Sequence, residues 1–206
     1  MNFEIKQVNK NFTQVCFYIL DENQYQVGQI DVNSGMMPST SQAAVSVWDR
    51  RLYLNEIPLV QARFDNPYQN IAKKPFEVFD ISGDLGGGRI FYNEFKHSFA
   101  SRINMQTMCI NNCLFEVYKA SFGKQGSKGA IYCNKVRIAN IYKGYKVIDD
   151  VHNYTVEMLN DNYLLEVSTI VTHWYLSSHY SKDQTIKGVH TTIMTTRDKD
   201  LLDKVN

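Results

Sequence analysis

The stretch FEVYKASFGKQGSKGAIYCN at residues 115–134 carries the pattern that decides the fold. It opens with Phe-Glu-Val-Tyr, in which apolar and polar residues alternate. It then passes a glycine-rich connection and returns through Ile-Tyr-Cys. Alternation with a period of two is typical of a strand with one buried face. The stretch therefore predicts a β-hairpin.

A second stretch, FEVFDISGDLGGGRIFYN at 76–93, has the same order of features. The similarity indicates either an internal repeat of one hairpin or two meandering hairpins of one sheet that look alike. Residues 17–32 predict another hairpin, with its turn at Asp21-Glu22-Asn23-Gln24.

Further strands are expected after residue 134. Lys135–Ile141 and Lys146–Ile148 predict a third strand pair, and Tyr154–Leu159 predicts one more strand before a turn at Asp161-Asn162. With 13 Tyr and 11 Phe, which suit pleated surfaces, the chain is expected to be mostly β.

Residues 34–75 predict an irregular segment, because all four prolines lie there and proline breaks regular elements. Within it, Ala43–Arg50 fits a short helix, or a strand that buries Val45 and Val47. The pattern leaves both alternatives open.

The period changes in YLLEVSTIVTHWYL at 163–176. At about 100° per residue, one stripe collects apolar residues, and the flanks are apolar too. The stripe consists of Leu164, Val167, Val171, Trp174 and Tyr175. This pattern favours a buried helix at about Tyr163–Ser178, while its β-branched residues leave a buried strand as the alternative. Residues 180–206 then form a C-terminal extension.

Three stretches together resemble the tubby-like C-terminal domain family, which includes the LURP-one-related proteins and the phospholipid scramblases. They are FYILDENQYQVGQI at 17–30, the segment 115–158, and the apolar run at 163–176. The resemblance covers 16–178 with a gap over 34–75. It implies a closed antiparallel β-barrel of about a dozen strands around a central C-terminal helix. It also implies an association with phosphoinositides or other phospholipids.

Length and composition fit this architecture. The chain has 206 residues, of which 44% are hydrophobic and 21% charged, as expected for a single globular domain over 1–206. Four cysteines are too few for a disulfide scaffold, and the charged start of the chain is unlike a secretory signal. The apolar run Val167–Ser181 is too short to span a bilayer as a helix. We therefore expect a cytoplasmic protein, with peripheral membrane contact as an extension of that expectation.

Motifs for chemistry are weak. The glycine-rich stretches at 83–89 and 123–129 lack the order of residues that phosphate-binding loops need, and they are expected to be hairpin connections. Cys109 and Cys113 would point to the same side of one strand and are interpreted as buried thiols. The five histidines are scattered. We expect no enzyme activity, no cofactor and no metal site.

One charged region stands out. Seven basic residues and no acidic residue lie between Val117 and Ile148. The whole chain carries +1, so the remainder carries −6. Alternation places Lys135 and Arg137 on one outer strand face, with Val136 and Ile138 packed inward. The predicted ligand-binding residues are Lys124, Lys128, Lys135, Arg137, Lys143 and Lys146.

This basic face supports two hypotheses. The first is a binding module for anionic phospholipid headgroups or another phosphate-bearing ligand, since each base near an anionic membrane contributes about 1 kcal/mol. The second is a protein-interaction or regulatory scaffold for an acidic protein partner. Interleaved tyrosines also suit single-stranded nucleic acid, but the near-zero net charge disfavours that class. Ordinary solubilising charge on an exposed barrel face is the alternative to a binding role.

Overall fold

A computed structural model describes residues 1–9, 14–33, 42–57, 78–84, 86–91, 103–121, 126–144, 151–177 and 203–206. Twelve strands follow in chain order: β1 (Asn2–Gln7), β2 (Gln14–Leu20), β3 (Gln26–Asn33), β4 (Gln42–Val47), β5 (Arg50–Ile57), β6 (Val78–Gly83), β7 (Gly86–Phe91), β8 (Ile103–Ile110), β9 (Cys113–Ser121), β10 (Ser127–Cys133), β11 (Val136–Lys143) and β12 (Asn153–Met158).

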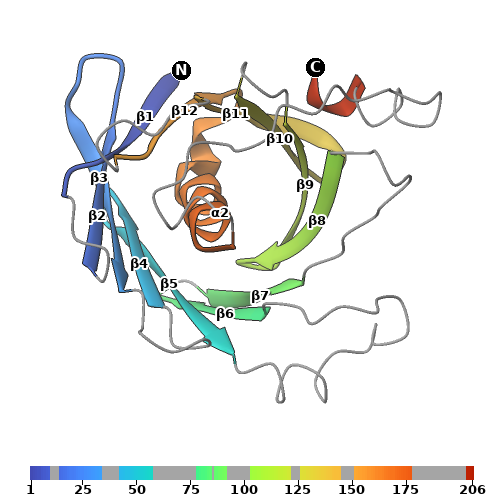
Figure 1. The fold of residues 1–206 in the computed structure, drawn as a ribbon. Helices are drawn as coiled ribbons and strands as arrows, with labels where there is room; N and C mark the ends of the chain where they lie inside the picture. The colour runs from blue at the N-terminus through green and yellow to red at the C-terminus, as the bar shows by residue number, and fades with distance from the viewer. Residues whose placement is uncertain are drawn as a thin grey trace.

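The strands form one closed antiparallel barrel, in which each strand pairs with its neighbours in the chain (Figure 1). β1 and β12 close the ring, in a register that runs from Asn2 opposite Glu157 to Lys6 opposite Asn153. Closure leaves the sheet without an exposed edge. The predicted fold class, a closed antiparallel β-barrel around a helix, is confirmed.

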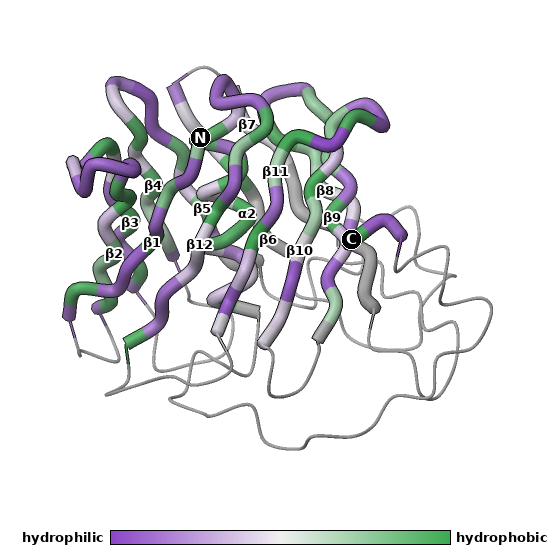
Figure 2. Tube along the Cα trace, turned by 90° about the horizontal axis from the view of Figure 1, so that it is seen from above, coloured by the Kyte–Doolittle hydropathy of each residue, from purple (hydrophilic) through white to green (hydrophobic). Residues whose placement is uncertain are grey.

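Alternating side chains explain why these segments form the barrel wall. Along β2, Val15, Phe17 and Ile19 are buried, while the residues between them are partly exposed. Figure 2 shows the same change between hydrophilic and hydrophobic residues along many of the strands. The inward side chains make one continuous core with the helix.

Tight turns join consecutive strands at one end of the barrel. Asn111 and Asn112, between β8 and β9, have φ values of 51° and 61°, and Asn134 and Lys135, between β10 and β11, have 50° and 67°. Two consecutive residues with positive φ are typical of the hairpin turns that match strand twist, and asparagine tolerates this conformation. We call this end of the barrel the turn end.

A short 3-10 helix, η2 (Asp161–Tyr163), leads into the helix α2 (Leu164–Ser177), which lies inside the barrel (Figure 1). The segment is a helix, and every residue from 164 to 175 is buried, so the predicted buried helix is confirmed and the strand alternative is wrong. The hydroxyls of Thr169 and Thr172 donate to the carbonyls of Leu165 and Ser168, four residues earlier. These bonds satisfy the hydroxyl groups inside the core.

The prediction of an irregular segment over 34–75 is wrong in part. Residues 42–57 are not irregular but form β4 and β5, so the strand alternative for Ala43–Arg50 is right up to Val47. The four prolines lie outside both strands and leave their ladders intact. Residues 34–41, 58–75 and 146–148 lie outside the described part of the chain.

Candidate functional site

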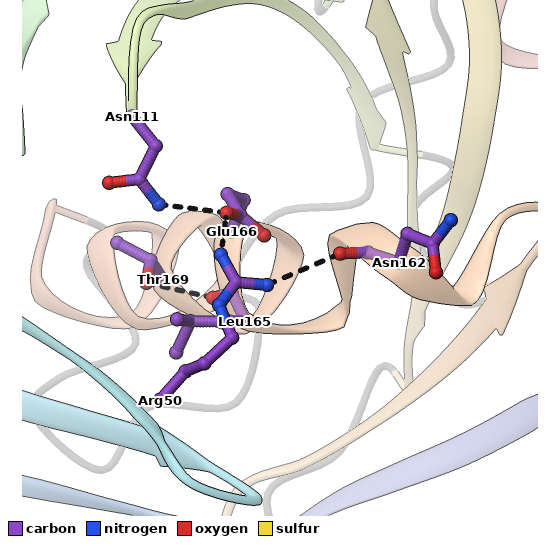
Figure 3. Close-up of polar contacts among 6 residues, drawn as sticks. All are labelled: Arg50, Asn111, Asn162, Leu165, Glu166 and Thr169. Carbon is purple, nitrogen blue, oxygen red and sulfur yellow. Dashed lines mark hydrogen bonds and ion pairs between the residues drawn. The ribbon is translucent and has the colours of Figure 1, made fainter. Parts of the chain in front are cut away.

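The turn end of the barrel is joined to α2 by an ion pair (Figure 3). Glu166, in the first turn of the helix, accepts from Arg50 Nη2 at 2.6 Å and from Asn111 Nδ2 at 2.8 Å, both through Oε1. Arg50 Nη1 also donates to the carbonyl of Asn162 at 3.4 Å. A carboxylate is favourable at the positive N-terminal end of a helix. These contacts fix the helix within the barrel, so we interpret them as structural.

The opposite end of the interior, where α2 ends, contains a group of basic side chains. We call it the interior basic cluster, and it consists of Lys119, Lys143, His152 and His173. The lysines come from β9 and β11, His152 precedes β12, and His173 lies on α2. Four nitrogen-bearing side chains from four parts of the chain thus meet at one end of the helix.

Lys143 is almost completely buried, at 3% relative exposure. Its Nζ lies 3.1 Å from Nδ1 of His152 and 5.0 Å from the ring centroid of Tyr154. Burial lowers the pKa of Lys143 to about 8, because the charged ammonium group loses hydration.

Lys119 points inward from β9 and keeps part of its surface exposed to solvent. Its Nζ lies 4.3 Å from the ring centroid of Trp174. The residue opposite Lys119 on β10 is Gly129, where a Cβ atom would lie 2.9 Å from Cζ3 of Trp174. The missing side chain therefore provides the space for the indole. Burial, and then the charge of Lys143, lower the pKa of Lys119 to about 7.

His173 is fully buried on α2, and burial followed by the charge of Lys119 lowers its pKa to about 3. Its imidazole is therefore neutral at physiological pH. Two aromatic contacts complete the surroundings: Tyr175 lies 5.2 Å from the ring of His152, and Tyr154 lies 6.2 Å from Trp174. The cluster combines mutually repelling ammonium groups with aromatic walls. Positive charge at this end also suits the negative C-terminal end of the helix dipole.

The predicted ligand-binding residues are dispersed. Lys128 is exposed on the outside of β10, with its Nζ 5.9 Å from the ring centroid of Tyr142, and Lys135 is exposed in the turn before β11. Arg137 faces outward from β11 and is partly buried. Lys124 and Lys146 lie outside the described residues.

Two details of the predicted outer face are wrong. Lys143 points into the barrel, and Val136 is 64% exposed rather than packed inward. Val136 is the first residue of β11, next to the turn, and is exposed although its partner Cys133 is buried. The direction of Lys143 follows from a register shift in the β10–β11 ladder: Ile131 pairs with Ala139, but Tyr132 pairs with Arg137. One extra residue in a strand reverses the alternation beyond it. Arg137 and Lys143 therefore lie on opposite sides of the wall.

Sequence reasoning did not assign Lys119, His152 or His173 to a binding site. One signal was available for Lys119, because it continues the alternation of Phe115 and Val117, which are both buried. A basic residue at an inward position of a strand is unusual enough to be a candidate.

The cysteine prediction is also corrected. Cys109 is the second-last residue of β8 and Cys113 is the first residue of β9, with a turn between the strands, so the two cysteines do not share a strand. Both are partly exposed rather than buried. Among the described residues, no group of three or more His, Cys, Asp or Glu side chains could hold a metal ion.

Within the described part of the chain, no helix has the length and apolar character needed to cross a membrane. No protein-family model matches the sequence, and neither a curated protein nor a solved structure is significantly similar to the chain.

Proposed function

We propose that the protein is a non-catalytic binding module for an anionic, phosphate-bearing ligand, and that this ligand is the headgroup of a phospholipid. The observation that carries the proposal is the concentration of basic residues on three adjacent strands and their turn. The outer face of β10, β11 and the turn between them carries Lys128, Lys135 and Arg137. Two further lysines, Lys119 on β9 and Lys143 on β11, point into the barrel. The sequence has no acidic residue between Val117 and Ile148.

The resemblance to the tubby-like family supports the same proposal. A barrel of twelve strands around a C-terminal helix is the architecture that this resemblance implies. We propose that the chain is a member of that family and acts in the cytoplasm, with peripheral contact to an anionic membrane.

Electrostatics set the expected strength of this contact. Each exposed base close to an anionic membrane contributes about 1 kcal/mol, and the attraction decays within about 10 Å at 0.1 M salt. Lys128 and Lys135 are the exposed bases whose side chains the structure describes on this wall. Binding through them and their neighbours would be reversible and sensitive to salt.

Co-sedimentation with vesicles tests the proposal. We expect the protein to sediment with vesicles that contain phosphatidylserine, but not with pure phosphatidylcholine, and to be released by high salt. The double variant Lys128→Glu, Lys135→Glu should bind much more weakly. The matched control is Lys6→Glu, Arg51→Glu, which makes the same change of charge at exposed positions on β1 and β5.

Two outcomes would contradict the proposal. Equal loss in both double variants would show that only net charge matters and that no specific face binds. Absence of binding to any vesicle would remove the lipid proposal and favour the alternative, a scaffold for an acidic protein partner.

A further inference from the structure

The outer face of β9 and β10 has an apolar patch that is covered by the end of the chain. Val205, in the C-terminal segment 203–206, is 3% exposed and forms one apolar cluster with four outward residues of these strands. The four are Tyr118, Ala120, Ala130 and Tyr132. The two tyrosine rings meet edge to face, with centroids 5.5 Å apart. Val205 therefore occupies an apolar site on the outside of the barrel.

Hydrogen bonds hold the backbone of the segment on both sides of this contact. The hydroxyl of Tyr132 donates to the carbonyl of Lys204 at 2.9 Å. Nη2 of Arg137 donates to the carbonyl of Val205, also at 2.9 Å. Both acceptors are main-chain carbonyls of the helical turn at 203–205, so the barrel binds the backbone of this turn as well as the Val205 side chain.

The residues that bind the segment are themselves held in position. Nε of Arg137 donates to Oδ1 of Asn140 at 2.6 Å, and Nδ2 of Asn140 donates to Glu157 at 2.7 Å. Nζ of Lys204 lies 5.1 Å from the ring centroid of Tyr132, which adds a cation–π contact. Pre-positioned partners lower the cost of ordering a bound peptide.

The contact is small. One buried apolar side chain, two hydrogen bonds and one cation–π contact hold the described residues of the segment, and contacts of this size stabilise an attached segment only modestly. The segment can therefore leave and return without unfolding the barrel.

We propose that the outer face of β9–β11 is a peptide-docking surface, that the C-terminal segment 203–206 occupies it reversibly, and that the docked segment keeps Arg137 from anionic ligands. The last part rests on the proposed function. In the docked state two donors of the Arg137 guanidinium are bonded to Asn140 and to the carbonyl of Val205, so they are not available to a phosphate group. Release of the segment would make Arg137 and two tyrosines suited to a membrane interface accessible on the outer face of β9–β11.

Digestion by a carboxypeptidase tests docking independently of any ligand. The variant Tyr132→Phe, Arg137→Gln removes both hydrogen bonds to the segment but leaves the sequence of the segment unchanged. Intact-mass measurements should show faster loss of Asn206 and Val205 from this variant, by severalfold. The control is Arg51→Gln, Tyr53→Phe, an outward Arg–Tyr pair on β5 whose side chains also meet, at 3.5 Å. Equal digestion rates in the two variants and the native protein would overturn docking.

Vesicle binding by Val205→Ser tests the blocking of Arg137. This variant weakens docking without a change of charge, and one additional base corresponds to about fivefold tighter binding to anionic vesicles. Adding Arg137→Gln should abolish the gain. Equal binding by the native protein and Val205→Ser would refute blocking. Failure of both to bind would refute the proposed function, while the digestion experiment would still decide docking.

Discussion

The two ends of α2 lie in opposite kinds of charge environment. At the turn end, Glu166 meets Arg50 and Asn111 within 2.8 Å, so a buried carboxylate has a cation and a neutral donor. At the other end, the charged neighbour that shifts the pKa of Lys119 is a second lysine, Lys143. Opposite charges at one end hold the helix in place, whereas like charges at the other end weaken the folded state. The comparison indicates which end has a structural role and which can respond to an anion or to pH.

The largest effect is expected from breaking the ion pair at the turn end. Arg50→Ala leaves the Glu166 carboxylate buried, at 5% side-chain exposure, without its cation. Removing one partner of a buried pair costs about 3 kcal/mol or more. Urea unfolding should show this loss of stability. Arg51→Ala, which changes the adjacent and exposed arginine, should have little effect, and an equal loss in the two variants would mean that the ion pair does not hold the helix.

A smaller loss is expected from filling the space beside Trp174. Gly129→Ala would place a Cβ atom 2.9 Å from the indole and force it to move, and overpacking of this kind costs about 1–3 kcal/mol. The matched control is Gly144→Ala, because a Cβ atom there meets nothing within 4 Å. If both variants were as stable as the native protein in urea, the indole would not be packed against the strand.

The lysines at the other end predict a dependence of stability on pH. The pKa values of Lys119 and Lys143 fall to about 7 and about 8 in the folded state, from 10.5. At a pH between the folded value and the ordinary value of 10.5, each lysine binds more protons in the unfolded chain than in the folded protein. The free energy of unfolding should therefore rise as the pH increases from about 7 towards 9. Lys119→Met should flatten this rise in thermal-unfolding curves.

The measurement has an upper pH limit and a matched control variant. Burial raises the pKa of Cys16 from 9.0 to about 11 and the pKa of Tyr175 from 10.0 to about 12. Both groups therefore lower stability as the pH rises above their ordinary values, and the comparison belongs below about pH 9. Lys6→Met, at an exposed position, should keep the slope of the native protein. A slope unchanged by Lys119→Met would show that this lysine does not weaken the folded state.

The smallest effect should be the same in the two halves of α2. Thr169→Val and Thr172→Val each remove a hydroxyl that donates to a carbonyl four residues earlier. Each bond is local to the helix and has a net value of about 1 kcal/mol or less. Unfolding free energies of the two variants should therefore agree closely. A large difference would mean that the two halves of the helix differ in packing.

The architecture could be predicted because it depends on short-range periodicity. Alternating runs such as 17–32 and 115–134 became hairpins, and the apolar run at 163–176 became the central helix. The strand β8 was not predicted, since the sequence INMQTMCI alternates only weakly. Residues 42–57 were interpreted as irregular because of prolines that lie outside them.

The site was harder to predict because it depends on long-range geometry. The inward direction of Lys143 follows from a single register shift opposite Ile131 and Tyr132, and no residue type in β11 marks that shift. The contact between Arg137 and Val205 joins residues 68 positions apart. Local alternation cannot reveal either feature. The concentration of basic residues on these strands was therefore predicted, but not which of them face outward and which point into the barrel.

The order of elements along the chain also constrains how the molecule is made. The closing pair of strands aligns Phe3 with Val156, and α2 follows both. During synthesis, eleven strands leave the ribosome before the twelfth, and the helix that fills their interior comes later still. Domains rich in such distant pairings fold slowly and expose apolar surface while they wait. The nascent chain should therefore depend on chaperones until α2 has emerged, and folding should be completed only after translation has passed Ser177.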